Sequence, residues 1–327
     1  MSPNTQQELA SLSSTPLHGV TLALDKTTNN TNTPFTLDVS FNPVTPLSNP
    51  KTAWTLTDKG ERYESNITLN REDDCYQLHI DCEGQGTFQL QGNQLTIDWQ
   101  ANGTGPAHYL QTLGLSLFLE LQGHLCLHAN TLVKNNQAQL FLAPSRTGKS
   151  TLTTLLTTLG YTLTTDDMAA LYHTHEQYEV YPSWPKVRLW PDSAAMLENH
   201  LTTQPVQQKK VHERFAKQEI SFAAQDTHTA TPVTAMYYLN RVDEQPQSAN
   251  PLTITQIKPS AALIILMQNS MLGDAYRGLG IEQSRIMALA ALLQRIPFYR
   301  VTYPSGLDQL PDIAKHLDEW LQSEQAK

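Results

Sequence analysis

The fold is decided by the stretch Phe141-Leu142-Ala143-Pro144-Ser145-Arg146-Thr147-Gly148-Lys149-Ser150-Thr151. The apolar run 138–142 predicts a buried strand ahead of the turn. After the turn, apolar residues recur at i, i+3, i+4 and i+7, which indicates one face of a helix: Leu152, Leu155, Leu156 and Leu159. Strand, turn, Gly-Lys-Ser and helix together form the context of a phosphate-binding loop. We therefore expect an α/β domain built around a nucleotide site.

The chemistry of this loop comes from its backbone and from two side chains. Backbone N–H groups at the start of a helix point at an anion, and the helix dipole favours negative charge there. Lys149 is expected to reach the β- and γ-phosphates, and the Ser150 hydroxyl is expected to bind Mg²⁺. The predicted nucleotide-binding residues are Ala143, Pro144, Ser145, Arg146, Thr147, Gly148, Lys149, Ser150 and Thr151. Ala143 stands where the motif has its first glycine, and the alternative is a chance Gly-Lys-Ser at a helix start.

Composition narrows the class of protein. The chain has 327 residues, enough for two domains or one large one, and its net charge of −9 argues against a general nucleic-acid surface. Three cysteines without metal-site spacing indicate reduced thiols in the cytoplasm. The N-terminal residues lack a signal-peptide pattern, and the apolar run 261–267 is too short to span a bilayer. We expect a cytoplasmic protein without membrane or nucleic-acid partners.

Two domains are predicted, 1–104 and 105–327. The first alternates apolar and polar residues between turn signals, which is typical of an antiparallel β module. The boundary is Ala101-Asn102-Gly103-Thr104-Gly105-Pro106. Strands are expected in the first domain at 20–24, 35–39, 76–80, 87–90 and 95–99. In the second, helices are expected at 108–121, 191–197, 260–272, 281–295 and 308–323, and strands at 125–127, 161–165, 168–172, 179–181, 233–239 and 298–301.

Asp166 and Asp167 follow the strand predicted at 161–165. Carboxylates at the end of a strand beside a phosphate loop are typical metal and base positions in phosphoryl transfer. Adjacent strand residues point to opposite faces, so only one should face the phosphates unless the strand has already ended. One carboxylate is expected to hold Mg²⁺ and the other to accept a hydroxyl proton. The alternative is an Asp pair that merely starts a turn.

Several ordered motifs now resemble a known family. They are Leu127-His128-Ala129, the Ser-x-x-Gly-Lys-Ser-Thr loop, Gly160-Tyr161-x-Leu163 and Asp166-Asp167. Together they are similar to the HPr serine kinase/phosphorylase superfamily, and most of all to its HPr-kinase-related branch. The resemblance covers about 105–172 and does not extend to 1–104.

This resemblance implies a phosphoenolpyruvate-carboxykinase-like core and transfer of the γ-phosphate of ATP to a hydroxyl, most simply a serine of a protein or peptide. It implies that His128 lies near the γ-phosphate, that Lys149 and Ser150 hold nucleotide and Mg²⁺, and that the base is Asp166 or Asp167. A structural histidine beside a strand is the alternative for His128.

The chain departs from that family at a later strand. The family carries a metal-binding Glu two residues before an Arg, whereas this chain has Lys186-Val187-Arg188. Asp192 is a candidate substitute. The family's Pro-Gly-Arg-Asn segment has no counterpart, which puts phosphorylase activity and HPr as acceptor in question.

Basic and aromatic residues supply further candidates. Arg214, beside Lys209 and Lys210, is a candidate for stabilising transition-state charge, and a solvated helix face is the alternative. Arg188 is either an anion contact or part of a structural pair. Trp184 and Trp190 form either an acceptor or base-stacking wall or ordinary core.

The sequence thus predicts an ATP-dependent serine kinase acting on a protein or peptide. Two alternatives stay open: a small-molecule kinase for a sugar or amino acid, and a non-catalytic nucleotide-binding regulatory or assembly protein. GTP in place of ATP and a homo-oligomer are also left open.

Overall fold

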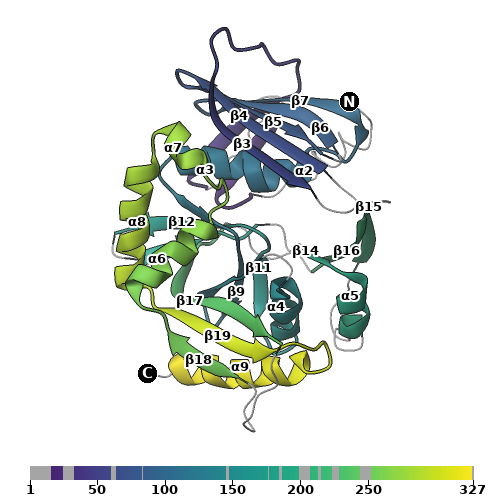
Figure 1. Ribbon diagram of the computed structural model, residues 1–327, viewed down its shortest axis with the longest axis vertical. Coiled ribbons are helices and arrows are strands. Elements are labelled where there is room, and N and C mark those ends of the chain that lie inside the picture. Colours follow the sequence, from purple (N-terminus) through teal and green to yellow (C-terminus); the bar gives the residue numbers. More distant parts are fainter. Residues whose placement is uncertain are drawn as a thin grey trace. The chain divides into compact units, whose positions relative to one another are not determined.

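A computed structural model describes most of the chain. The described residues are 16–24, 33–59, 64–82, 84–144, 147–175, 177–183, 186–198, 207–212, 215–222, 228–243 and 252–325. They form a mixed α/β fold with three sheets (Figure 1). The finer expectation of a phosphoenolpyruvate-carboxykinase-like core stays a prediction.

Contacts divide the chain into two compact units. Unit 1 comprises Met1–Cys126, Thr227–Ala230 and Ser270–Ala288, and unit 2 comprises Leu127–Asp226, Thr231–Asn269 and Leu289–Lys327. The sequence-based boundary at 104/105 lies before this division. Ring contacts explain the difference, because Phe35 meets Phe118 at 5.6 Å and Trp99 meets Tyr109 at 5.4 Å between centroids. These contacts join the helical segment after residue 105 to the β-rich part.

The sheet of unit 1 has the order β1-β2-β7-β6-β5-β4-β3. Its strands are β1 (Val20–Leu24), β2 (Phe35–Ser40), β3 (Lys51–Lys59), β4 (Glu64–Glu72), β5 (Cys75–Asp81), β6 (Gly84–Gln91) and β7 (Gln94–Gly103). The expectation of an antiparallel module was wrong in part, because β2 pairs in parallel with both β1 and β7. β3 and β4 were not expected as strands. β3 buries only Trp54 and so shows no alternation of apolar and polar residues.

Helices complete unit 1. The segment expected as one helix is α2 (Ala107–Tyr109), a π-helical turn η1 (Leu110–Gly114) and α3 (Leu115–Leu121). The short helix α7 (Ala275–Leu279), which was not expected, packs on β3. Gly278 permits that approach, since a Cβ there would lie 2.1 Å from the Ala53 carbonyl oxygen. The Arg71 guanidinium donates to the Leu279 carbonyl oxygen at 3.0 Å and fixes the end of α7.

A buried ion pair lies inside unit 1. Arg285 Nε contacts Glu120 Oε2 at 2.9 Å, and both side chains are almost fully buried. The Tyr276 hydroxyl and the Cys126 N–H also donate to Glu120 Oε1, at 3.1 and 2.9 Å. Burial raises the pKa of Glu120, and Arg285 opposes that shift. The carboxylate is therefore retained in the interior only with its full set of donors.

Unit 2 is organised around a mixed sheet in which β11, β9, β10, β17, β13 and β12 are successive neighbours. β10 (Gln137–Leu142) pairs in parallel with β17 (Thr231–Val242) and antiparallel with β9 (Ala129–Lys134). β17 pairs in parallel with β19 (Phe298–Pro304), which pairs with β18 (Thr253–Gln256). The remaining strands are β8 (Leu125–Leu127), β11 (Thr162–Thr165), β12 (Ala169–Thr174) and β13 (Gln177–Val180).

Helices α4 (Lys149–Thr157) and α9 (Leu310–Gln325) cover one face of this sheet (Figure 1). Their leucines pack with Phe141 and Tyr237, whose rings stack at 5.2 Å between centroids. The strand at 138–142 and the helix after Gly148 are confirmed. Burial of this face fixes the axis of α4 relative to β10, and so fixes the loop between them.

The remaining elements are shorter. α5 (Pro191–Glu198) follows β14 (Lys186–Leu189), which forms a small sheet of order β14-β16-β15 with β15 (Gln207–His212) and β16 (Phe215–Ser221). The helical alternative was wrong for Lys209 and Lys210, which belong to β15, while Arg214 lies outside the described residues. α6 (Pro259–Gln268) ends before the expected residue 272, and α8 (Glu282–Arg295) matches its prediction. No helix in the described part combines the length and apolar character needed to cross a bilayer.

Replacement of Arg285 by methionine tests the ion pair of unit 1. Arg285→Met leaves the Glu120 carboxylate buried without its cation, and we expect a loss of about 3–5 kcal/mol in unfolding free energy. The double variant Glu120→Leu/Arg285→Met removes both charges and should recover much of that loss. Urea unfolding followed by circular dichroism measures both. Equal losses in the single and double variants would contradict a charge-based explanation.

Candidate functional site

The loop after β10 has the geometry of a strand-to-helix turn. Ala143 is fully buried, and Thr147 closes the turn by donating from Oγ1 to the Pro144 carbonyl oxygen at 2.7 Å. Gly148 is the N-cap of α4 with φ +97°, a left-handed conformation that favours glycine. Ser145 and Arg146 lie outside the described residues. The requirement for glycine therefore falls at Gly148, and Ala143 occupies a packed position that tolerates a methyl group.

Lys149 is the first residue of α4, and its side chain is only 7% exposed. Its ammonium hydrogen-bonds to Asn130 Oδ1 and lies 3.4 Å from Asp167 Oδ1. A buried ammonium needs such acceptors. The cation is thus held at the beginning of the helix.

Both carboxylates of the Asp pair lie at the loop. β11 ends at Thr165, and Asp167 has a left-handed backbone with φ +62°. Strand alternation therefore no longer applies to the pair. The Ser150 hydroxyl donates to Asp166 Oδ1 at 3.2 Å, while Asp167 contacts Lys149. Because β11 ends before the Asp pair, both carboxylates can face the loop. Asp166 contacts Ser150, and Asp167 contacts Lys149.

Asp166 is a carboxylate that resists ionisation. Burial raises its pKa to about 7, and the neighbouring Asp167 adds to the shift. Lys149, the Arg188 N–H at 3.4 Å from Oδ2 and the Ser150 hydroxyl act in the opposite direction. A cation placed beside Asp166 would lower this pKa. The described residues hold no cluster of three or more His, Cys, Asp or Glu side chains suited to a metal.

His128 lies on the same side of the site. Its Nε2 is 3.5 Å from Asp167 Oδ1, and its side chain is 36% exposed. Its backbone N–H donates to the Asn269 carbonyl oxygen at 2.7 Å. The backbone of His128 is thus anchored, and its side chain lines a cavity beside the loop. The structure thus brings His128, Lys149 and Asp167 together.

A small cavity of about 80 Å³ opens beside the loop. Its lining residues are His128, Pro144, Gly148, Lys149, Ser150, Thr151, Asp167, Arg188, Leu189 and Trp190. Arg188 lines it while its Nε lies 3.8 Å from Glu219 Oε2. Both roles that the sequence left open for Arg188 are thus compatible with its position. Trp190, 40% exposed, forms part of the wall.

Some candidates are placed elsewhere. Thr151 Oγ1 lies 3.1 Å from Ser193 Oγ, so this hydroxyl joins α4 to α5. Asp192 is an exposed residue in the first turn of α5 and does not line the cavity. Arg214 and Trp184 lie outside the described residues. Arg214 as a catalytic residue therefore stays a prediction.

Asn130 is a residue of this site that the sequence reasoning missed. It is fully buried in β9 and joins Lys149 to Asp167 through its side-chain oxygen. The available signal was a single amide two residues after His128, in a strand that also contains Thr131 and Lys134. That signal does not reveal its partners, which lie 19 and 37 residues away along the chain.

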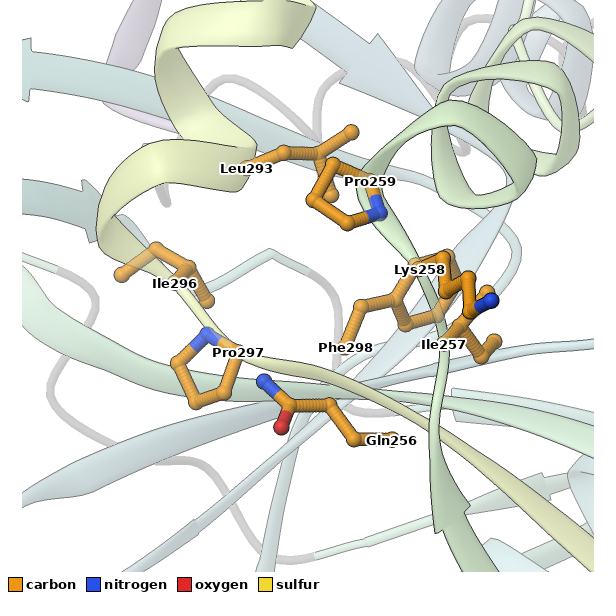
Figure 2. Close-up of a pocket in the computed structure, with 8 residues that line it drawn as sticks. All are labelled: Gln256, Ile257, Lys258, Pro259, Leu293, Ile296, Pro297 and Phe298. Atoms are coloured by element: carbon orange, nitrogen blue, oxygen red, sulfur yellow. The ribbon is translucent and has the colours of Figure 1, made fainter.

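A larger cavity of about 260 Å³ lies between the start of α6, the end of α8 and the start of β19 (Figure 2). Apolar side chains dominate it, and Lys258 is its one charged lining residue. No carboxylate, histidine or phosphate-loop residue lines it. Polar and charged side chains converge on the smaller cavity instead. The smaller cavity is therefore the candidate active site.

Comparison with known proteins finds distant structural similarity and no match in sequence. No protein-family model matches the chain, and no curated protein matches it. Among solved structures, the Hpr(Ser) kinase/phosphatase from Coxiella burnetii aligns with 61% of this chain and 98% of its own length. The two are 16% identical, with a TM-score of 0.30. The relationship to that protein is distant.

The raised pKa of Asp166 predicts a dependence of stability on pH. The folded state holds this proton more tightly than the unfolded chain, so ionisation opposes folding as pH rises from about 4 to about 7. We expect the wild type to lose unfolding free energy over that range relative to Asp166→Asn, which cannot ionise. Parallel urea titrations of both proteins measure this, and an unchanged difference across the range would contradict it.

Proposed function

We propose that this protein is a phosphotransferase that moves the γ-phosphate of ATP to a hydroxyl, most simply a serine of a protein or peptide. The observation that carries the proposal is the convergence of Lys149, Asp166 and Asp167 at the first turn of α4. One cation and two acids around a helix N-terminus suit phosphate binding and proton transfer.

The nucleotide phosphates would lie at the N-terminus of α4. Gly148, with its left-handed backbone, lets the chain turn so that the first N–H groups of α4 face the anion. Lys149 would exchange part of its contact with Asp167 for the β- and γ-phosphates. Burial at 7% exposure strengthens that attraction, because the surrounding dielectric is low.

Magnesium would be held by Ser150 and Asp166. Their oxygen atoms, 3.2 Å apart, are a hydroxyl and a carboxylate, the hard donors that Mg²⁺ prefers with phosphate. The raised pKa of Asp166 fits a carboxylate that is completed by a cation. When bound, the ion neutralises phosphate charge.

Asp167 is the proposed general base. It is 34% exposed, lines the cavity and contacts both Lys149 and His128. In the proposed step the acceptor hydroxyl gives its proton to the Asp167 carboxylate while its oxygen forms a bond to the γ-phosphorus. The bond from that phosphorus to the bridging oxygen breaks, and ADP leaves with the electron pair. Arg188 and Trp190 would border the acceptor.

A second candidate is a non-catalytic nucleotide-binding protein. It is favoured by the same contacts of Asp167, because a carboxylate oxygen already in contact with Lys149 and His128 is less available to an acceptor hydroxyl. Transfer to a small molecule, and GTP in place of ATP, are further alternatives that differ only in what the cavity accepts.

Replacement of Asp167 by asparagine separates enzyme from binding protein. Asp167→Asn keeps the size of the side chain and removes its basicity, so we expect turnover of ATP to fall about 100-fold or more. Affinity for magnesium-bound nucleotide should change by no more than about fivefold, since Lys149 and Ser150 remain. Stopped-time assays of phosphate transfer and calorimetric titration measure the two effects.

The matched control is Asp192→Asn, which removes an exposed carboxylate that does not line the cavity. It should behave as the wild type in both assays. Tight nucleotide binding by a wild type that does not turn over ATP or GTP would support the non-catalytic candidate. Absence of nucleotide binding would end both proposals.

A further inference from the structure

We infer that Asn130 is a positioning residue that aligns Lys149 with Asp167, and that its neutral amide, rather than a carboxylate, is what the site needs. This inference rests on the proposed function and concerns the same site. It starts from one side chain whose hydrogen bonds reach both the helix and the strand that supply the reacting groups.

Asn130 occupies the strand between the two elements of the site. β9 pairs with β10 on one side, where Asn130 faces Phe141, and with β11 on the other, where Thr131 faces Thr165. β10 leads into the phosphate loop and β11 leads into the Asp pair. Asn130 is fully buried, so water does not compete for its polar atoms. Its amide can therefore fix both neighbours at once.

The hydrogen bonds of Asn130 fix the orientation of its amide. Oδ1 accepts from the Lys149 ammonium and from the Asp167 N–H, the latter at 3.2 Å. Nδ2 donates to Thr153 Oγ1 at 2.9 Å, and that hydroxyl donates to the Lys149 carbonyl oxygen at 3.0 Å. A reversed amide would point its own N–H groups at an ammonium and an N–H. Only one orientation satisfies all the donors.

The bond to Asp167 supports an uncommon backbone conformation. Asp167 has φ +62°, which L-residues adopt rarely and at a cost in free energy. Its N–H is held by Asn130 Oδ1 in that conformation. The left-handed turn brings the carboxylate to within 3.4 Å of Lys149 Nζ. Asn130 thus places the acid as well as the lysine.

The neutrality of the amide matters for Lys149. This ammonium already lies near the carboxylate of Asp167. A second carboxylate in place of Asn130 would neutralise it further and weaken its attraction for phosphate. It would also add a negative charge close to Asp166 and Asp167, which repels the phosphates further. A change from amide to carboxylate therefore tests electrostatics at almost constant volume.

The experiment compares Asn130→Asp, Asn130→Leu and the matched control Thr131→Val. Thr131 is the next residue of β9, is also fully buried, and accepts a hydrogen bond from Thr165 Oγ1 at 2.9 Å.

We expect Asn130→Leu to lower kcat about 100-fold, because the lysine and the acid lose their alignment. We expect Asn130→Asp to raise KM for magnesium–ATP about tenfold or more, because the added charge repels the phosphates. Thr131→Val should stay within about threefold of the wild type in kcat and KM, whatever its thermal stability.

A second readout needs no activity. Labelling of the nucleotide-free protein with acetic anhydride at one fixed pH, read by mass spectrometry, reports how readily the Lys149 amine reacts. The labelled fraction of Lys149 should differ from the wild type in Asn130→Leu and Asn130→Asp, because its contact with the Asn130 amide is lost, and should stay unchanged in Thr131→Val. Folding of each variant is checked by circular dichroism.

The two proposals fail in different ways. A wild type that binds no magnesium–nucleotide refutes the proposed function, while the labelling experiment still tests the effect of Asn130 on Lys149. If labelling of Lys149 is the same in all four proteins, Asn130 does not position the lysine. The inference is also overturned if Asn130→Leu and Asn130→Asp keep the wild-type kcat and KM, or if Thr131→Val loses as much activity as they do.

Discussion

A positive charge held below the surface is the constraint on which the site depends. The Lys149 ammonium is placed by the helix that Gly148 caps, and that helix is placed by leucines packed on the sheet of unit 2. Once buried, the ammonium requires acceptors, and it has them in Asn130 and Asp167. The pairing of β9 with β10 on one side and with β11 on the other is therefore linked to one lysine. The loop, the acids and the amide are parts of a single electrostatic arrangement.

Two carboxylates, Glu120 and Asp166, show how structural and functional charge differ. Glu120 has a guanidinium, a phenol and an N–H as partners, which together account for its charge inside unit 1. Asp166 has a hydroxyl and one long N–H contact, and its pKa stays raised. A buried acid with a complete set of donors is a structural feature. A buried acid whose set is incomplete, beside a phosphate-loop turn, is a candidate for binding a cation.

The departures of the sequence from the loop motif have local physical reasons. Ala143 lies in the packed interior at the end of β10, where a methyl group fits, and the left-handed turn is taken by Gly148. The strand that carries Arg188 has Lys186 where the family that the sequence resembles carries a Glu. Glu219, on the neighbouring strand β16, lies 2.8 Å from Lys186 and 3.8 Å from Arg188. Pairing of strands thus supplies a negative charge that the linear motif lacks.

The sequence by itself determined the elements whose signals are local: β10, the start of α4 at Lys149, and the Asp pair at the end of β11. Periodicity and a glycine before Lys149 suffice for these, because hydrogen bonds within a helix and the turn before it join near neighbours. Only the tertiary structure decided the parallel pairing of β2, the polar strand β3, the Glu120–Arg285 pair and the role of Asn130. Each of these depends on residues far apart in the chain, and no local pattern records which side chain a buried amide or carboxylate will meet.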